Sequence, residues 1–113
     1  MSIALRRRVM DWFGILSSAR RLAAAREPWV SASEASEYGL DLLAAAEFDG
    51  LSEQQRRILL IHGEMWLARP HWDRSELIVL LGKQLDTYRL FGLPKQIDTE
   101  LATTLETLRA LAL

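Results

Sequence analysis

The stretch that decides the fold runs from Ile61 to Asp73 and reads Ile-His-Gly-Glu-Met-Trp-Leu-Ala-Arg-Pro-His-Trp-Asp. Pro70 lacks a backbone N–H, and its ring disfavours the α region for the residue before it, so a helix must end near Ala68. Asp73 stands three residues before Glu76, a spacing that caps the start of a second helix. The stretch therefore predicts two helices joined by a rigid aromatic turn.

Capping residues and apolar periodicity predict further helices on both sides of this pair. Ser31 with Glu34 and Ser52 with Gln55 have the spacing of capping boxes. The predicted helices span residues 2–26, 32–47, 53–68, 74–90 and 95–112, the last beginning at Lys95 or Thr99. No strand pattern is visible, and 27–30 is expected to be a linker. We predict an all-α fold: residues 1–113 form one small domain of four to five helices, with a long N-terminal helix and a helical hairpin.

Length and composition narrow the class of protein. A chain of 113 residues has room for one core. It has no cysteine, which excludes disulfides and thiolate chemistry. Its apolar runs are too short to span a bilayer, and no apolar segment typical of a secretion signal follows Arg6-Arg7-Arg8. We expect a soluble cytoplasmic protein that makes no membrane contact.

The net charge of −1 hides two blocks of opposite sign. Residues 1–26 hold six arginines and one acid, whereas residues 27–55 hold seven acids and no base. These blocks either neutralise each other, within the fold or across a dimer, or leave the basic segment to meet an acidic partner.

Residues suited to catalysis are sparse. The sequence has no zinc-protease, phosphate-loop, nucleophile-elbow or dinucleotide motif. The helix over 53–68 is expected to turn Ile58, Ile61, His62 and Met65 inward, which makes His62 an interior or boundary imidazole. His71 lies in the turn at a spacing that does not indicate a metal site. We therefore predict no enzyme activity, no cofactor and no metal ion.

Protein binding fits the aromatic content better, because tryptophan and arginine dominate binding hot spots. Trp29 lies in the expected linker and Trp72 in the turn, so each either contacts a partner or packs under a loop. We name Trp29, Val30, Arg69 and Trp72 as candidate partner-binding residues. A heptad-like stripe on the first helix is the candidate for self-association, and it consists of Leu5, Val9, Trp12, Phe13 and Leu16.

DNA binding is the alternative function. Residues 75–83 are similar to the first helix and turn glycine of a helix-turn-helix, with residues 84–91 as a short recognition helix. That helix offers few side chains for phosphates or base edges, and the acidic block would repel DNA.

The whole chain resembles the QslA-like quorum-sensing anti-activators of bacteria, most clearly in the helix from Ile3 to Arg26 and in the segment from Ile61 to Leu77. The resemblance implies a non-enzymatic homodimer that regulates transcription through protein–protein interaction. It further implies binding to the ligand-binding domain of a LuxR-type, LasR-like transcription regulator, which would block dimerisation and DNA binding of that regulator. It implies no direct nucleic-acid contact and no small-molecule substrate.

Overall fold

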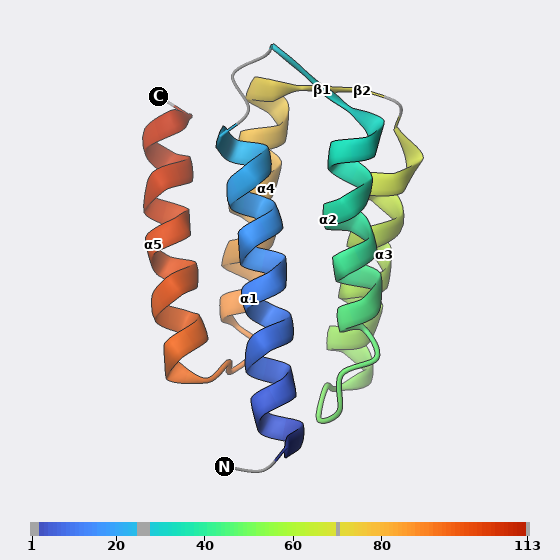
Figure 1. Ribbon diagram of the computed structural model, residues 1–113, viewed down its shortest axis with the longest axis vertical. Helices are drawn as coiled ribbons and strands as arrows, with labels where there is room; N and C mark the ends of the chain where they lie inside the picture. Colours follow the sequence, from blue (N-terminus) through green and yellow to red (C-terminus); the bar gives the residue numbers. More distant parts are fainter. Residues whose placement is uncertain (1–2, 25–27, 70, 113) are drawn as a thin grey trace.

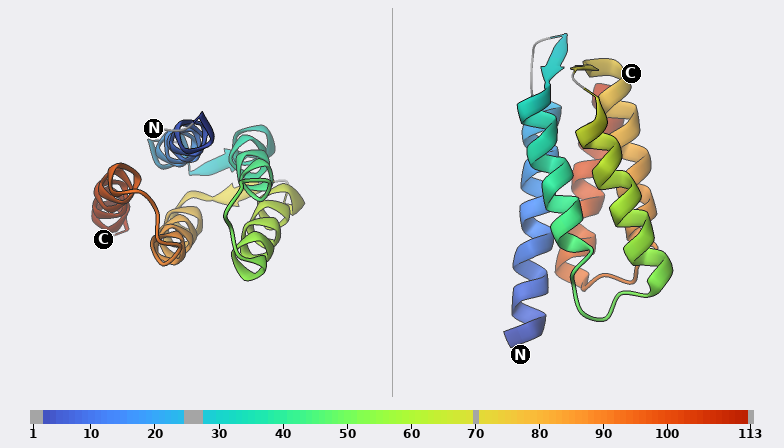
Figure 2. Two further views of the ribbon diagram at one scale, coloured as in Figure 1. Left: turned by 90° about the horizontal axis from the view of Figure 1, so that it is seen from below. Right: turned by 90° about the vertical axis from the view of Figure 1, so that its right-hand side faces the viewer.

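The structure, a computed structural model, describes residues 3–24, 28–69 and 71–112, with the backbone alone described for residues 3–11. Over these ranges the chain is all-α, as predicted. The helices are α1 (Ile3–Ala24), α2 (Ala32–Ala45), α3 (Glu53–Ala68), α4 (Arg74–Arg89) and α5 (Lys95–Leu111). Seen end-on, they surround the interior in the order α5, α1, α2, α3, α4 (Figures 1 and 2).

The predicted helix starts are confirmed by their caps. The side chains of Ser31 and Ser52 accept hydrogen bonds from the backbone N–H groups of Glu34 and Gln55, and both capping boxes are complete. Asp73 accepts from the backbone N–H of Glu76 at 3.2 Å. Helix α3 ends at Ala68 as expected, although Pro70, the residue invoked to stop it, lies outside the described residues. The end of the expected first helix, residues 25–26, and the first residue of the expected linker, Glu27, also lie outside them.

Two short strands are the feature that the sequence did not predict. Strands β1 (Trp29–Ser31) and β2 (His71–Asp73) pair antiparallel, with Val30 opposite Trp72. This ribbon crosses one end of the bundle (Figure 1). The expectation of no strand is therefore wrong at these positions, because a three-residue strand is too short to show alternation and its partner lies far away in the sequence.

Helix α1 buries Trp12, Leu16, Ala19 and Ala23 in the core. Its N-terminal end extends past the other helices in Figure 1, as its predicted length requires. In the described part of the chain, no helix combines the length and the apolar character needed to cross a bilayer.

Helix α4 buries a wide apolar face, whereas α3 buries its predicted face only in part: Ile58 and Met65 pack against the core and Ile61 does not. Five residues of one α4 face are all buried: Leu77, Ile78, Leu81, Leu85 and Tyr88. In α3 the fully buried residues are Leu59, Gly63 and Trp66. Ile61, expected inside, is 57% exposed. Helix α3 is rotated because its glycine, rather than its isoleucines, faces α2.

The close crossing of α2 and α3 explains this rotation. A Cβ added to Gly39 would lie 3.0 Å from the Gly63 carbonyl oxygen, and one added to Gly63 would lie 3.0 Å from the Gly39 oxygen and 2.7 Å from Leu43 Cδ2. The helices can approach this closely only because both positions lack a side chain. Gly39 of α2 and Gly63 of α3 thus let the two helices come near.

We expect Gly63→Ala to lower the free energy of unfolding by about 1–2 kcal/mol, because overpacking outweighs the gain in helix propensity. Urea unfolding measures this change. Gly82→Ala is the matched control, since a Cβ there has no atom within 4 Å and should raise stability by up to about 1 kcal/mol. A Gly63→Ala variant as stable as the Gly82→Ala variant would contradict the close crossing.

Candidate functional site

An open groove between α3 and α4 is the candidate functional site. It has a volume of about 700 Å³ and begins at the β1–β2 ribbon. One wall comes from Met65 and Arg69 of α3, and the other from α4. Among its described lining residues, apolar side chains occupy the middle and charged ones the ends: Met65, Arg69, Trp72, Ser75, Glu76, Val79, Leu80 and Lys83.

The ribbon end of the groove is built around Trp72. Its ring stacks on Trp66 with centroids 4.4 Å apart, and the Arg69 guanidinium lies 4.2 Å from its centroid on a cation–π contact. Arg69 also donates hydrogen bonds to both carboxylate oxygens of Glu76, at 2.8 and 3.2 Å. These hydrogen bonds lower the pKa of the Glu76 carboxyl, so the pair stays charged at neutral pH. Arg69 is thereby held in place before any partner arrives.

The four candidate partner-binding residues lie at this same end, but only two reach the surface. Alternation along the ribbon turns Val30 and Trp72 inward, where they are 0% and 1% exposed. Trp29 points outward and is 61% exposed, and Arg69 is partly exposed. Trp29 lies opposite Asp73 in the ribbon. Trp72 therefore contributes to the site by positioning Arg69. Of the two tryptophans in the ribbon, Trp29 is the one whose side chain a partner can contact.

Two side-chain hydrogen bonds link α3 to α4. Trp66 Nε1 donates to Gln84 Oε1 at 2.8 Å, and the Tyr88 hydroxyl and His62 Nδ1 form a hydrogen bond of 2.7 Å. Burial raises the pKa of the Tyr88 hydroxyl far above its ordinary value, so it stays protonated. His62 is half-buried, which fits the expectation of a boundary imidazole.

Two buried polar atoms in the described region have no hydrogen-bond partner: Trp72 Nε1 and Gln84 Nε2. Each belongs to a side chain of the aromatic interior around Trp66. Unpaired buried donors are costly, at about 1–3 kcal/mol each. The aromatic packing of this region must offset that cost.

The stripe proposed for self-association has three residues whose side chains the structure describes, and these lie in the core or pack against it. Trp12 and Leu16 are 3% and 0% exposed within a single chain, and Phe13 is partly buried. The side chains of Leu5 and Val9 lie outside the described residues. Trp12 and Leu16 are therefore core residues. The heptad pattern could not show this, because a helix face in the core and a helix face in a dimer interface both need apolar side chains at the same spacing.

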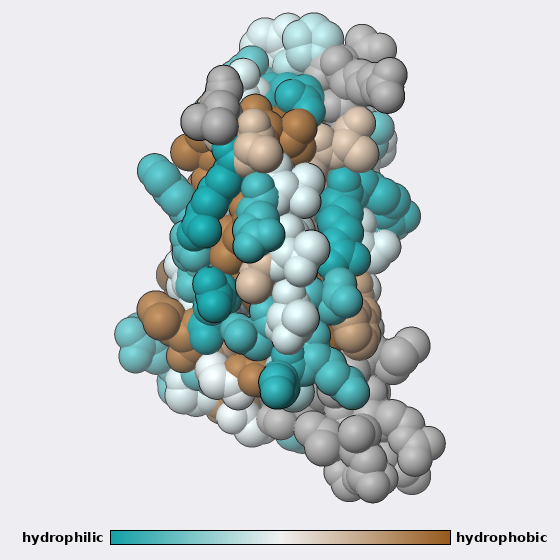
Figure 3. Space-filling view, turned by 90° about the vertical axis from the view of Figure 1, so that its left-hand side faces the viewer, coloured by the Kyte–Doolittle hydropathy of each residue, from teal (hydrophilic) through white to brown (hydrophobic). Residues whose placement is uncertain are grey.

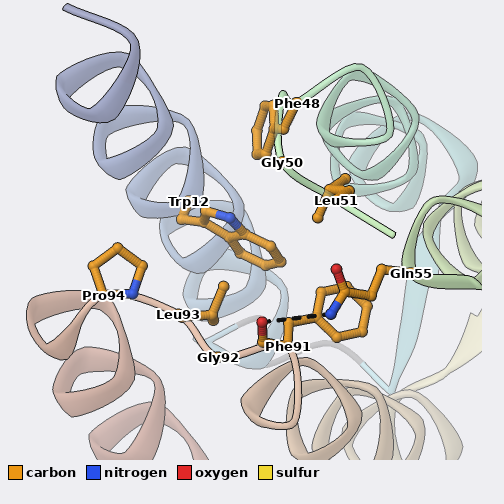
Figure 4. Close-up of a pocket in the computed structure, with 9 residues that line it drawn as sticks. All are labelled: Trp12, Phe48, Gly50, Leu51, Gln55, Phe91, Gly92, Leu93 and Pro94. Atoms are coloured by element: carbon orange, nitrogen blue, oxygen red, sulfur yellow. Dashed lines mark hydrogen bonds between the residues drawn. The ribbon is translucent and has the colours of Figure 1, made fainter. Parts of the chain in front are cut away.

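Trp12 instead forms the wall of a second hollow, of about 190 Å³, at the end of the bundle opposite the ribbon. In Figure 4 its ring lies between Phe48 and Gly50 of the α2–α3 loop on one side and Leu93 and Phe91 of the α4–α5 loop on the other. Trp12 makes edge contacts with Phe48 and Phe91, at centroid distances of 6.0 and 6.3 Å. These rings hold the two loops against α1.

The structure also bears on two other kinds of site considered from the sequence, a DNA-binding helix-turn-helix and a metal site. Arg74–Arg89 is one continuous helix with Gly82 inside it, so the predicted helix-turn-helix with a turn at Gly82 is wrong. Glycine costs only about 1 kcal/mol within a helix, and packing overrides it. The described residues contain no cluster of acids and histidines able to hold a metal ion. The face over α5 is largely hydrophilic (Figure 3).

Comparison with known protein families, curated proteins and solved structures gives no match to this chain.

The buried His62–Tyr88 pair predicts a pH dependence of stability. Burial lowers the pKa of His62 below its ordinary 6.5, so below that pH the unfolded chain binds more protons than the folded chain. The His62 contribution is full above about pH 6.5 and is lost as the pH falls toward the lowered value. Urea unfolding at pH 7 and pH 5 should show a smaller loss of stability for His62→Gln than for the unaltered chain. His71→Gln, at an exposed position, is the control, and equal losses in all three proteins would contradict the prediction.

Proposed function

We propose that this chain is a non-enzymatic anti-activator that binds the ligand-binding domain of a LuxR-type, LasR-like quorum-sensing regulator in the bacterial cytoplasm. Binding would cover the dimer interface of the regulator and so prevent its dimerisation and DNA binding. The target class comes from the resemblance of the sequence to QslA-like anti-activators. The observation that carries the protein-binding part is the exposed Trp29 in the ribbon, at the end of the bundle where the α3–α4 groove begins.

The composition of this end supports protein recognition. Interface centres are apolar and enriched in tryptophan, methionine and arginine, and they are surrounded by charged groups. The ribbon carries the exposed Trp29, and the groove that begins at the ribbon is lined by Met65 and by the ion pair of Arg69 with Glu76. A tryptophan that is 61% exposed leaves a large apolar area in water, and a partner surface that covers it gains that area.

The inhibitory mechanism follows from mass action. A regulator that binds DNA only as a dimer is silenced when its monomer binds the inhibitor more favourably than it binds a second monomer. Nothing catalytic is needed, because the inhibitor acts by occupying an apolar surface.

Light scattering of the chain mixed with a ligand-bound LasR-type ligand-binding domain tests the proposal. We expect a stable mixed complex and loss of the regulator homodimer. A regulator that remains a homodimer at micromolar excess of the chain would refute the anti-activator function.

Trp29→Ala should weaken this complex by about 30-fold, the loss expected for a hot-spot residue of about 2 kcal/mol. Leu90→Ala is the matched control, since Leu90 is 84% exposed at the end of α4 away from the ribbon. Titration calorimetry measures both affinities, and urea unfolding checks that both variants keep the stability of the unaltered chain. Equal affinity of the two variants would remove Trp29 from the interface.

We also propose that the chain is a homodimer that uses the apolar residues at the start of α1. Because Trp12 and Leu16 belong to the core, the variant that tests this is Leu5→Asp with Val9→Asp. Light scattering of the chain alone should give a dimer mass that the double variant reduces to a monomer mass. A double variant that remains dimeric would place self-association elsewhere.

A further inference from the structure

The charge along the α3–α4 groove is uneven. At the ribbon end the two charges are paired, because Arg69 and Glu76 hydrogen-bond each other. At the other end stands Lys83, which has no ion-pair partner in the described part of the chain. The next acid along α4, Asp86, is bound by Arg109 of α5 at 3.3 Å. An occupant of the groove therefore meets one uncompensated positive charge, at the end away from the ribbon.

The apolar surface continues beyond the groove. Val79 in the α4 wall is 47% exposed. On α3, Ile61 is 57% exposed and stands one turn before Met65, so Ile61, Met65 and Arg69 follow one line of the helix at steps of four. The apolar lining of the groove is thus followed along α3 by a further exposed apolar residue, Ile61.

This shape favours a helix over a small molecule. Small-molecule sites are concave and bury most of their ligand. Here the groove is open and its walls are partly exposed. The lining residues of α4 from Glu76 to Lys83 cover about two turns, or roughly 10 Å. Helix-in-groove recognition uses a groove of this kind, with apolar anchors at i, i+3 or i+4, and i+7.

The charge also argues against a second copy of this chain. In a two-fold dimer the same patch faces itself. If the two grooves ran parallel, Lys83 would face a second Lys83. If they ran antiparallel, Lys83 would face the ribbon end, where Glu76 is already paired with Arg69. Neither arrangement gives Lys83 an unpaired acid from the groove.

We propose that the α3–α4 groove binds an amphipathic α-helix of the partner protein, and that an acidic side chain of this helix pairs with Lys83. The proposal rests on the protein-binding function proposed above and names the element of the partner that is recognised. Its apolar residues cover Met65, Val79 and Leu80. Its acidic residue lies at the end away from the ribbon.

Two synthetic peptides test the groove without the regulator. Each is a 15-residue helix of alanine, glutamine and leucine with leucines at i, i+4, i+7 and i+11. One carries a single glutamate at the edge of the leucine stripe, and its twin carries lysine there. With the full isotope-labelled chain, we expect backbone amide shifts confined to residues around the groove. The glutamate peptide should bind about three- to five-fold more tightly than its twin, as a partly exposed ion pair allows.

Variants sharpen the test. Lys83→Glu should reverse the preference between the two peptides, whereas Lys95→Glu, at the exposed start of α5, should leave it unchanged. Val79→Asp should weaken both peptides by more than ten-fold. All three positions are exposed, and the amide spectrum of each free variant reports whether it is folded. If Val79→Asp fails to fold, the reversed peptide preference of Lys83→Glu still tests the proposal.

Other outcomes would overturn the proposal. These are amide shifts away from the groove, equal binding of the two peptides to the unaltered chain and to Lys83→Glu, or no binding. Groove shifts caused by decanoate but not by either peptide would assign a small amphiphile instead. Groove shifts that grow with the concentration of the chain alone would assign a second copy.

The regulator domain separates the two proposals. If the chain binds the regulator and neither the peptides nor Lys83→Glu shows an effect, the groove assignment falls and the anti-activator function stands. If the peptides bind as expected and the regulator does not bind, the anti-activator function is refuted and the assignment of the groove as a helix-binding site is retained.

Discussion

The stack of Trp66 on Trp72 is the contact on which both the fold and the candidate site depend. The two rings, 4.4 Å apart, come from α3 and β2, and both are fully buried. Tyr38 of α2 meets Trp66 edge-on at 5.2 Å. On its other side Trp72 carries the Arg69 guanidinium. One aromatic column therefore joins α2, α3, the ribbon and the surface, and the groove takes its shape at the end of this column.

The helical part of the fold was predictable because its signals are local. A capping box is read from residues three apart, and the apolar face of α4 is so wide that any rotation buries it. The rotation of α3 was not predictable in the same way. Its isoleucines suggested one inward face, but the contact between Gly39 and Gly63 selects another. The rotation of α3 depends on the residues of two helices at once, so the periodicity of α3 alone cannot predict it.

The candidate site was predictable in part. Trp29 and Arg69 were expected to meet a partner and do lie at the surface, whereas Val30 and Trp72 are buried. The difference comes from the ribbon, which sends neighbouring residues to opposite sides. The groove and Lys83 were missed, because a groove exists only between two helices placed in space. The wide apolar face of α4 was a signal that could have indicated it: Val79 and Leu80 exceed what one core contact requires.

The ribbon has a consequence for how the chain reaches its folded state. Pairing β1 with β2 brings the ends of the β1–α2–α3–β2 segment together, so this segment closes into a loop. Closing a long loop has an entropic cost that must be met before its contacts form. The α2–α3 hairpin shortens the path between the strands, so hairpin formation should precede strand pairing. The ribbon then holds the two ends of the α2–α3 hairpin side by side, because its strands precede α2 and follow α3.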